Sequence, residues 1–269
     1  MRRRLIILLL LLATGPASAD TFRAGGVGAA TKLLPRLFAA FDHKGDELEV
    51  IAGLGTSGGI KALEANVLDF AVAGRHLSDQ ETKQGLRIAL AIRTPFVLAT
   101  SHPKPNDLKG AEVPGIFASP NSTWADGSPL RVVLRPQSDS DTPLLAAMFP
   151  GMAQSMDVAR KRQDVPIAAT DQDNASLGES IGGSLVATTL TQIQTERRNL
   201  RLVSIDGVSP SLETVATGAY RFSKTLYFVL PARENPAVER FLAFLKSQKG
   251  KELLRDTGNI VTDDEQGRP

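Results

Sequence analysis

Three short segments rich in glycine and hydroxyl side chains have the composition of a small-anion site. They are residues 28–31 (Gly-Ala-Ala-Thr), 56–59 (Thr-Ser-Gly-Gly) and 140–142 (Ser-Asp-Thr). Each is expected between a strand and a helix, where the first amides of the helix lack partners and the helix dipole favours negative charge. Arg135 and Arg75 would add charge-assisted hydrogen bonds, worth about 1.5 to 3 kcal/mol each. This pattern indicates binding of a small oxyanion.

The same residues also have purely structural interpretations. Glycines between strands and helices often form turns and bind nothing. Thr142 stands before Pro143, an arrangement typical of a helix N-cap. Arg75 could pair with Asp79 on the surface instead of contacting a ligand, and such a pair contributes little to stability.

A catalytic interpretation of the second segment is less well supported. Residues 55–59 read Gly-Thr-Ser-Gly-Gly, which satisfies the Gly-x-Ser-x-Gly pattern and would make Ser57 a hydrolase nucleophile. That arrangement needs an acid and then a histidine well beyond the serine. The later histidines stand too close, at 76 and 102, and the third precedes the serine at 43. Three scattered histidines also lack metal-ligand spacing, so we expect no enzyme activity, metal site or cofactor.

The elements that would position these segments alternate between helix and strand. Apolar spacing predicts a helix over residues 33–41, and a strand follows over 48–52. A short helix is expected over 60–66 and a strand over 67–72, and a capping box at 78–81 should begin another helix. This order is typical of an α/β fold with a mostly parallel sheet covered by helices.

Two apolar, β-branched runs, over residues 88–100 and 225–230, are predicted to be strands that cross between two lobes. Between them, the polar run 171–174 (Asp-Gln-Asp-Asn) fits a solvated loop better than a cleft wall. The other predicted elements are a strand over 131–134, a helix that opens at Thr142, a strand over 200–205, a helix capped by Asn235 and a last helix over about 250–256.

The N-terminus has the layout of a secretory signal peptide. Three arginines at 2–4 precede an apolar run over 5–13, and Ala-Ser-Ala at 17–19 fits a signal peptidase site. The run is too short to span a bilayer, which needs about 20 residues. We therefore expect cleavage between Ala19 and Asp20, a periplasmic location, and no membrane insertion of the mature chain.

Composition narrows the functional classes further. The chain has no cysteine, which excludes disulfides, thiolate metal sites and a lipid-bearing cysteine. Removal of the leader would leave 28 basic and 29 acidic residues, so the mature chain lacks the charge of a nucleic-acid-binding protein. Only 5% of the residues are aromatic, which leaves few platforms for stacking bases or sugars.

The order and spacing of several motifs are more specific than any one of them. They are Gly-Val-Gly-Ala-Ala-Thr at 26–31, Gly-Thr-Ser-Gly-Gly-Ile-Lys-Ala-Leu at 55–63, Val-Leu-Asp-Phe-Ala at 67–71 before Arg75, Arg135 ahead of 140–142, Gly-Val-Ser-Pro-Ser at 207–211, Gly-Ala-Tyr at 218–220 and Leu-Tyr at 226–227. Along nearly the whole mature chain this pattern resembles the phosphate-binding proteins of high-affinity phosphate ABC importers.

The resemblance implies an α/β chain with the type II periplasmic binding protein fold, in which two α/β lobes joined by two crossing strands enclose a ligand cleft. Lobe I would comprise residues 20–99 plus 224–269, and lobe II residues 100–223. It also implies a monomer that passes a small anionic, phosphate-like ligand to a membrane permease. The expected ligand-binding residues are Ala30, Thr31, Ser57, Gly58, Gly74, Arg75, Arg135, Ser140, Asp141 and Thr142.

Several positions depart from the family's pattern. Gly74 stands where a serine or aspartate is usual, and Ala30 stands where a hydroxyl is usual. The third loop is one residue longer and places carboxylates at Asp139 and Asp141. A carboxylate about 4 Å from a unit negative charge costs roughly 4 kcal/mol at an effective dielectric of 20.

Two outcomes stay open for these carboxylates. They could turn away and pair with Arg135, which would leave an oxyanion site intact. Alternatively they could face the cleft and favour a zwitterionic, cationic or metal-bridged ligand. We therefore expect a periplasmic binding protein that captures phosphate or a related oxyanion for an ABC importer, with a sensor or adaptor of the same fold as the alternative.

Overall fold

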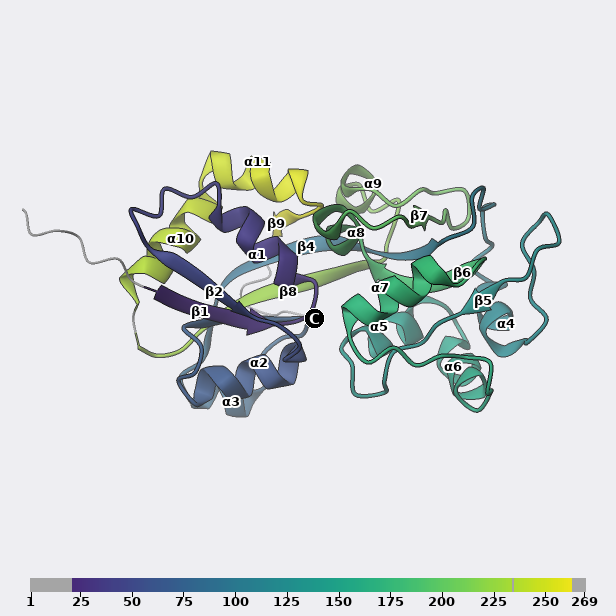
Figure 1. Cartoon of the computed structure of the whole chain (residues 1–269), viewed down its shortest axis with the longest axis horizontal. Helices are drawn as coiled ribbons and strands as arrows, with labels where there is room; N and C mark the ends of the chain where they lie inside the picture. Colours follow the sequence, from purple (N-terminus) through teal and green to yellow (C-terminus); the bar gives the residue numbers. More distant parts are fainter. Residues whose placement is uncertain (1–20, 234, 263–269) are drawn as a thin grey trace, which may run out of the picture.

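The computed structural model describes residues 21–233 and 235–262, so the predicted signal peptide and its cleavage site lie outside the described residues. The described chain forms two α/β halves side by side along the long axis (Figure 1). Each half has its own clusters of buried apolar side chains. The first half combines the N-terminal and C-terminal segments, and the second half is formed by the middle of the chain.

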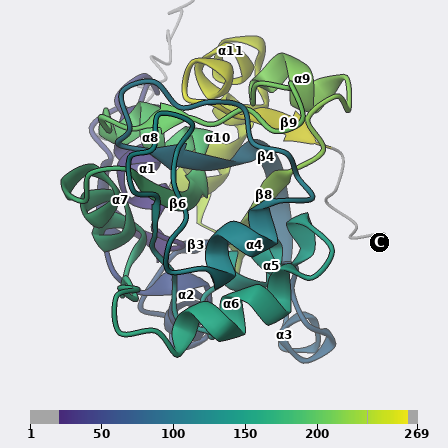
Figure 2. The same ribbon diagram turned by 90° about the vertical axis from the view of Figure 1, so that its right-hand side faces the viewer.

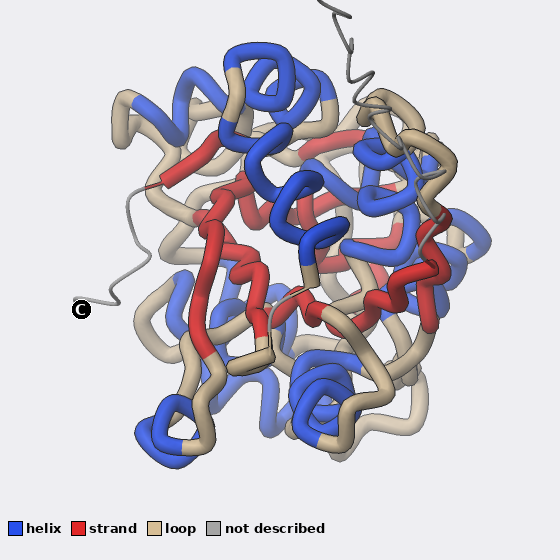
Figure 3. The backbone as a smooth tube through the Cα atoms, turned by 90° about the vertical axis from the view of Figure 1, so that its left-hand side faces the viewer, coloured by secondary structure: helices blue, strands red, loops and turns tan. Residues whose placement is uncertain are grey.

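The first half contains a sheet in the order β2-β1-β3-β8-β4, in which β2, β1 and β3 are parallel and β8 is antiparallel to β3. When the molecule is viewed from the end formed by the first half, these strands run through the centre with helices above and below them (Figure 3). Its elements are β1 (Thr21–Gly26), α1 (Ala30–Phe38), β2 (Glu47–Ile51), α2 (Gly55–Glu64), β3 (Phe70–Ala73), α3 (Asp79–Lys83), α10 (Pro236–Lys246), α11 (Gln248–Asp256) and β9 (Ile260–Thr262).

The second half is built around β6, which pairs with β4 on one side and with β5 on the other. Viewed from this end, α7 and α8 lie on one side of β6, and α4, α5 and α6 lie on the other (Figure 2). Its elements are α4 (Val113–Ala118), β5 (Arg131–Val132), α5 (Asp141–Met148), α6 (Met152–Arg160), α7 (Asp171–Ser180), β6 (Ser184–Thr189), α8 (Leu190–Glu196), β7 (Arg201–Leu202) and α9 (Leu212–Ala216).

Two strands, β4 (Arg87–Thr100) and β8 (Ser223–Leu230), run between the halves (Figure 1). β4 pairs with β8 from Arg87 to Pro95 and then with β6 from Phe96 to Ala99. One strand therefore belongs to both sheets. This arrangement confirms the predicted crossing strands and the predicted fold class, while the exact lobe boundaries after residues 99 and 223 stay a prediction.

Two helix starts differ from the prediction. α2 begins at Gly55 rather than near residue 60, so Gly58 and Gly59 are part of the helix instead of a loop. Gly59 explains this, because a Cβ there would lie 2.7 Å from the Cα of Gly26, so the helix can pack directly on β1 only with glycine. α5 begins at Asp141, so the predicted N-cap role of Thr142 is wrong. Its hydroxyl instead donates a hydrogen bond to the Pro136 carbonyl at 2.7 Å.

Other local predictions are confirmed or need smaller corrections. The capping box at Ser78 and the Asn235 cap of α10 are both present. β3 begins at Phe70, three residues later than predicted, and α11 begins at Gln248, slightly earlier than predicted. The strands predicted over 131–134 and 200–205 are each reduced to two residues.

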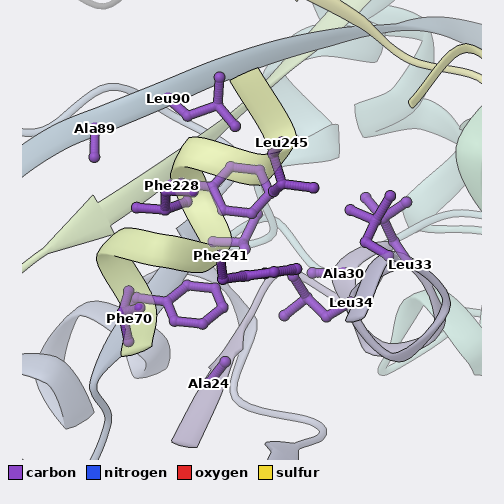
Figure 4. Packing of buried hydrophobic residues seen from close by; sticks show 14 of the residues in the cluster. Ala24, Ala30, Leu33, Leu34, Phe70, Ala89, Leu90, Phe228, Phe241 and Leu245 are labelled. Atoms are coloured by element: carbon purple, nitrogen blue, oxygen red, sulfur yellow. The ribbon is translucent and has the colours of Figure 1, made fainter. Parts of the chain in front are cut away.

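The core of the first half is centred on Phe241 of α10, which is wholly buried. Its ring lies 5.5 Å from that of Phe41, 5.8 Å from Phe38 and 6.2 Å from Phe70, measured between centroids. Figure 4 shows Phe241 pointing from its helix into the space between β3 and α1. Such aromatic contacts fix the C-terminal helix against the N-terminal strands and so hold the first half together.

One ion pair is buried where β8 crosses between the halves. The Nζ of Lys224 on β8 contacts the carboxylate of Asp141 at the start of α5, and both side chains are almost completely buried. Gly74 closes over this pair, because a Cβ at that position would lie 2.9 Å from the Lys224 Cε. A larger residue at position 74 would therefore require Lys224 or Ser140 to shift.

The two partners of this pair have shifted proton affinities. Burial raises the pKa of Asp141 to about 6, since desolvation and the nearby carboxylates of Asp171 and Asp139 outweigh the attraction of Lys224. Burial by itself would lower the pKa of Lys224, but Asp141 and Asp171 outweigh it and the pKa is raised. At neutral pH both side chains are therefore charged, and burial of either charge without the other would be costly.

We expect Phe241→Ala to lower the free energy of unfolding by about 3 to 5 kcal/mol, because it removes a large ring from a packed core. Urea denaturation followed by circular dichroism would measure this. Phe244→Ala, on the same helix but only partly buried, is the matched control and should cost clearly less. Equal losses from the two variants would contradict the central role of Phe241.

We expect Lys224→Met to destabilise the chain by about 3 to 5 kcal/mol at pH 8, because it leaves the Asp141 carboxylate buried without a counter-ion. Burial already raises the pKa of Asp141 to about 6 in the parent, and loss of the attraction from Lys224 raises that pKa further, so the folded variant takes up a proton as the pH falls and the unpaired charge disappears. The loss should therefore be smaller at pH 5. Urea unfolding at both pH values would measure it.

The control for this experiment is Lys224→Met combined with Asp141→Asn, which removes both charges. The double variant should be more stable at pH 8 than Lys224→Met alone, because no ionised group is left unpaired. A loss for Lys224→Met that is the same at pH 5 and pH 8 would contradict the assignment.

Candidate functional site

A cleft of about 480 Å³ lies between the two halves, which is a typical volume for a small-ligand site. In the first half its walls are residues 27–28 and 53–58 together with Arg75, and in the second half they are mainly residues 135–140 and 169–172. Most of these segments are loops or helix starts that follow strands. The cleft therefore brings together parts of the chain that are far apart in sequence.

Half of the predicted ligand residues line this cleft, and each of the two halves contributes some of them. They are Ser57, Gly58, Arg75, Arg135 and Ser140.

Ala30 and Thr31 lie behind the wall instead. Their amides donate to the carbonyls of Val27 and Gly28, at 3.0 Å in both cases, and so are already used within their own loop. It is Val27 and Gly28 that face the cleft. In the first loop, the donor available to a ligand is therefore not the pair of amides that the family pattern suggests.

Gly74, Asp141 and Thr142 are also absent from the cleft wall. The Gly74 amide donates to the Thr56 hydroxyl at 2.9 Å, which ties the loop after β3 to the start of α2. Asp141 and Thr142 border a much smaller cavity inside the second half. These three residues shape the site from behind.

The start of α2 is a group of hydrogen-bond donors that faces the cleft. The helix has no side-chain cap, and residues 55–58, its first turn, all line the cleft. Amides in the first turn of a helix have no partner inside the helix, and the positive end of the helix dipole lies at the same place. The Ser57 hydroxyl, which is exposed, adds a further donor.

Arg135 lies at the other wall and is already paired. Its guanidinium donates to Asp139 at 2.6 Å, to Asp171 at 2.9 Å and to the Ala168 carbonyl at 2.7 Å. The side chain is only 8% exposed. Of the two outcomes considered for the third loop, Asp139 therefore takes the first and pairs with Arg135, while Asp141 pairs with Lys224 instead.

Asp171 joins the two halves directly. One carboxylate oxygen accepts the bond from Arg135 in the second half, and the other accepts the Ala29 amide, at 3.0 Å, at the start of α1 in the first half. Its neighbour Gln172 donates to the Gly28 carbonyl at 3.1 Å. The solvated loop predicted for residues 171–174 is therefore wrong, because this segment begins α7 and forms part of the cleft.

A signal for this helix start was present in the sequence. Thr170 and Asp173 form a reciprocal capping box, in which each side chain bonds to the backbone amide of the other. The threonine and aspartate stand three residues apart, the spacing that marks a helix N-terminus. No apolar helix face was recognised around this polar run, however, and the run was therefore interpreted as a loop.

Arg75 is held away from the rest of the cleft by a neighbour. It pairs with Glu81 at 2.8 Å, not with the predicted Asp79, and its side chain is 41% exposed. The hydrogen bond from Arg75 lowers the pKa of Glu81 to about 2. Both terminal nitrogens of the Arg75 guanidinium bond to this carboxylate, so a ligand that binds Arg75 would have to displace Glu81.

Three carboxylates and two cations lie together at the second-half wall of the cleft and behind it. Asp139, Asp141 and Asp171 offer oxygens within 4.8 Å of one another, a spacing that could also suit a metal ion. Arg135 and Lys224 already contact all three carboxylates. The cluster is thus an ion-pair network, which has little charge left to attract a cation.

The histidines do not complete a hydrolase site at Ser57. His76 packs against Tyr227, and His102 stacks on Trp124 and contacts Asp126 in the second half. His43 packs against Phe38. Among the described residues that line the cleft, no histidine occurs.

Within residues 21–233 and 235–262, no helix combines the length and hydrophobicity needed to cross a membrane. No curated protein matches the chain.

Solved structures of phosphate-binding proteins have a similar fold. A putative phosphate ABC transporter substrate-binding protein with bound phosphate from Clostridium perfringens matches with a TM-score of 0.75 at 18% identity, over 91% of this chain and 100% of the other. A phosphate-binding protein from Stenotrophomonas maltophilia matches at 0.66 and 15%, over 93% and 92%. An ABC-type phosphate transport receptor from Vibrio cholerae matches at 0.60 and 18%, over 90% and 100%.

At these identities the likeness establishes the fold alone, and it agrees with the predicted type II arrangement. The family is identified from the sequence instead. A model described as the PBP superfamily domain matches residues 13–249, which is most of the chain. With two α/β halves, two crossing strands and an enclosed cleft, the chain belongs to the PBP superfamily.

Proposed function

We propose that this chain is a periplasmic solute-binding protein that captures phosphate or a related small oxyanion between its two halves. The ligand would then pass to the membrane permease of an ABC-type importer. Structural relatives described as phosphate-binding proteins or transport receptors support the general role. The contacts within this chain's own cleft support the ligand class.

The single observation that carries the oxyanion proposal is the carboxylate of Asp171. It is held at once by a backbone amide at a helix start and by a guanidinium, 3.0 Å and 2.9 Å away, one from each half. These are the donors that bind phosphate and carboxylate groups in proteins. The position between the halves thus already suits a planar or tetrahedral oxyanion.

The start of α2 offers a second set of donors. Residues 55–58 expose uncapped amides, and Ser57 on the same wall and Ser140 on the opposite wall carry hydroxyl groups. An oxyanion that reaches both this helix start and Arg135 would contact both halves. Binding would then stabilise the closed arrangement by the difference in affinity between closed and open states.

A sensor or adaptor that binds a less highly charged ligand is the second candidate. The observation in its favour is the set of carboxylates, because Asp139 stands on the cleft wall and a phosphate dianion near it would be repelled. Two like charges about 4 Å apart cost roughly 4 kcal/mol at an effective dielectric of 20. A monoanionic oxyanion or a zwitterion would suffer less.

Titration calorimetry with phosphate, sulfate, phosphonates and molybdate tests the proposal. We expect saturable binding of at least one of these anions, with one site per chain. Binding that weakens steadily as the chloride concentration rises, without a preferred anion, would indicate non-specific attraction only. A lack of heat from every anion would refute the oxyanion proposal and leave the sensor candidate.

We expect Ser57→Asp to weaken binding of the preferred anion at least tenfold, because it places a fixed negative charge at the helix start that the ligand would use. Thermal stability should not fall, since a carboxylate there interacts favourably with the helix dipole. Ser57→Ala is the matched control and should keep most of the affinity, because the backbone amides remain. Calorimetry on both variants would show whether the α2 start contacts the ligand.

A further inference from the structure

We infer that Asp171 is an internal ligand: its side chain occupies the oxyanion position of the cleft and holds the two halves closed when no solute is bound. That a solute must compete with it rests on the proposed function. The closure itself does not, because it depends only on contacts between parts of this chain.

The first half is shaped to receive this side chain. A Cβ on Gly28 would lie 2.5 Å from the Asp171 carboxylate oxygen and 2.7 Å from its Cβ, so no other residue type fits at Gly28 while Asp171 is in place. Gly28 does not need glycine for its backbone conformation, because it is not among the positions with positive φ. The space is therefore explained by the aspartate from the other half.

The second half holds Asp171 ready for this contact. The capping box at Thr170 and Asp173 fixes the start of α7, and the Asp171 carbonyl accepts a hydrogen bond from Gln192 at 2.9 Å. Asp171 is itself only 7% exposed. Because the side chain is already oriented, little conformational entropy is lost when it reaches the Ala29 amide.

The chemistry of the contact imitates that of a bound anion. Asp171 carries a negative charge, bonds to a helix-start amide and neutralises part of Arg135, as an oxyanion from solution would. A solute anion in the same place would have to displace the carboxylate or lie against it. Asp171 should therefore weaken oxyanion binding and make the closed form the resting state.

Closure can be measured directly because the chain has no cysteine of its own. Glu64→Cys on α2 and Lys161→Cys after α6 are exposed positions on the same side of the two halves, as Figure 1 shows for these helices. Spin labels at these cysteines would report the distance between the halves, measured by double electron–electron resonance spectroscopy. The labels would be placed in the otherwise unaltered full chain and in variants of it.

We expect the labelled parent to show one short distance that phosphate does not change. Asp171→Asn should shift the distribution to longer distances in the absence of ligand, because the charge that holds Arg135 and the Ala29 amide is gone. Asp42→Asn removes the same charge at an exposed position outside the cleft and should behave like the parent. Phosphate affinity should rise at least tenfold in Asp171→Asn and stay unchanged in Asp42→Asn.

Gly28→Ala provides a second test that leaves Asp171 intact. The added methyl group should displace the carboxylate and lengthen the distance as Asp171→Asn does, which keeps the inference testable if that variant fails to fold. A parent that is open without ligand and closes only on adding phosphate would overturn the inference but support the proposed function. If Asp171→Asn opens the cleft while no anion binds to the variant or to the parent, the internal closure is supported and the oxyanion proposal is refuted.

Discussion

Charges removed from water must be paired, and this constraint organises the centre of the molecule. Arg135 and Lys224 are almost fully buried, and each is matched by carboxylates from the third loop or from α7. An isolated buried charge would cost several kcal/mol, so neither cation could remain there alone. One electrostatic network consequently links the two halves, including β8 and the start of α5. The cleft lies next to this network.

Two glycines show how closely the backbone is fitted to that network. Gly28 leaves space for Asp171, and Gly74 leaves space for Lys224 and Ser140. In both places a side chain from elsewhere in the chain fills the volume that a Cβ would need. The glycine at 74, the carboxylates of the third loop and the aspartate at 171 are therefore connected, because they lie against the same buried cations.

The general fold was predictable because it depends on local patterns. Alternating helical and strand periodicity, the Ser78 capping box and the Asn235 cap each rest on neighbouring residues, and the structure agrees with them. The inner site was harder to predict. That Asp171 would reach Ala29, 142 residues earlier, depends on how the halves pack and on the absence of a side chain at Gly28, and no spacing along the sequence encodes either. The helical position of Gly58 and Gly59 was not predicted either, because it depends on the close packing of α2 against Gly26.

The exchange of partners along β4 has a mechanical consequence. Its hydrogen-bonding partner changes from β8 to β6 between Pro95 and Phe96. Proline has no amide hydrogen to donate, so the strand carries one fewer bond to break at the residue where its two ladders meet. Movement of one half relative to the other would therefore have to bend β4 near Pro95 and β8 near its partner Ser223, because these two strands cross between the halves side by side.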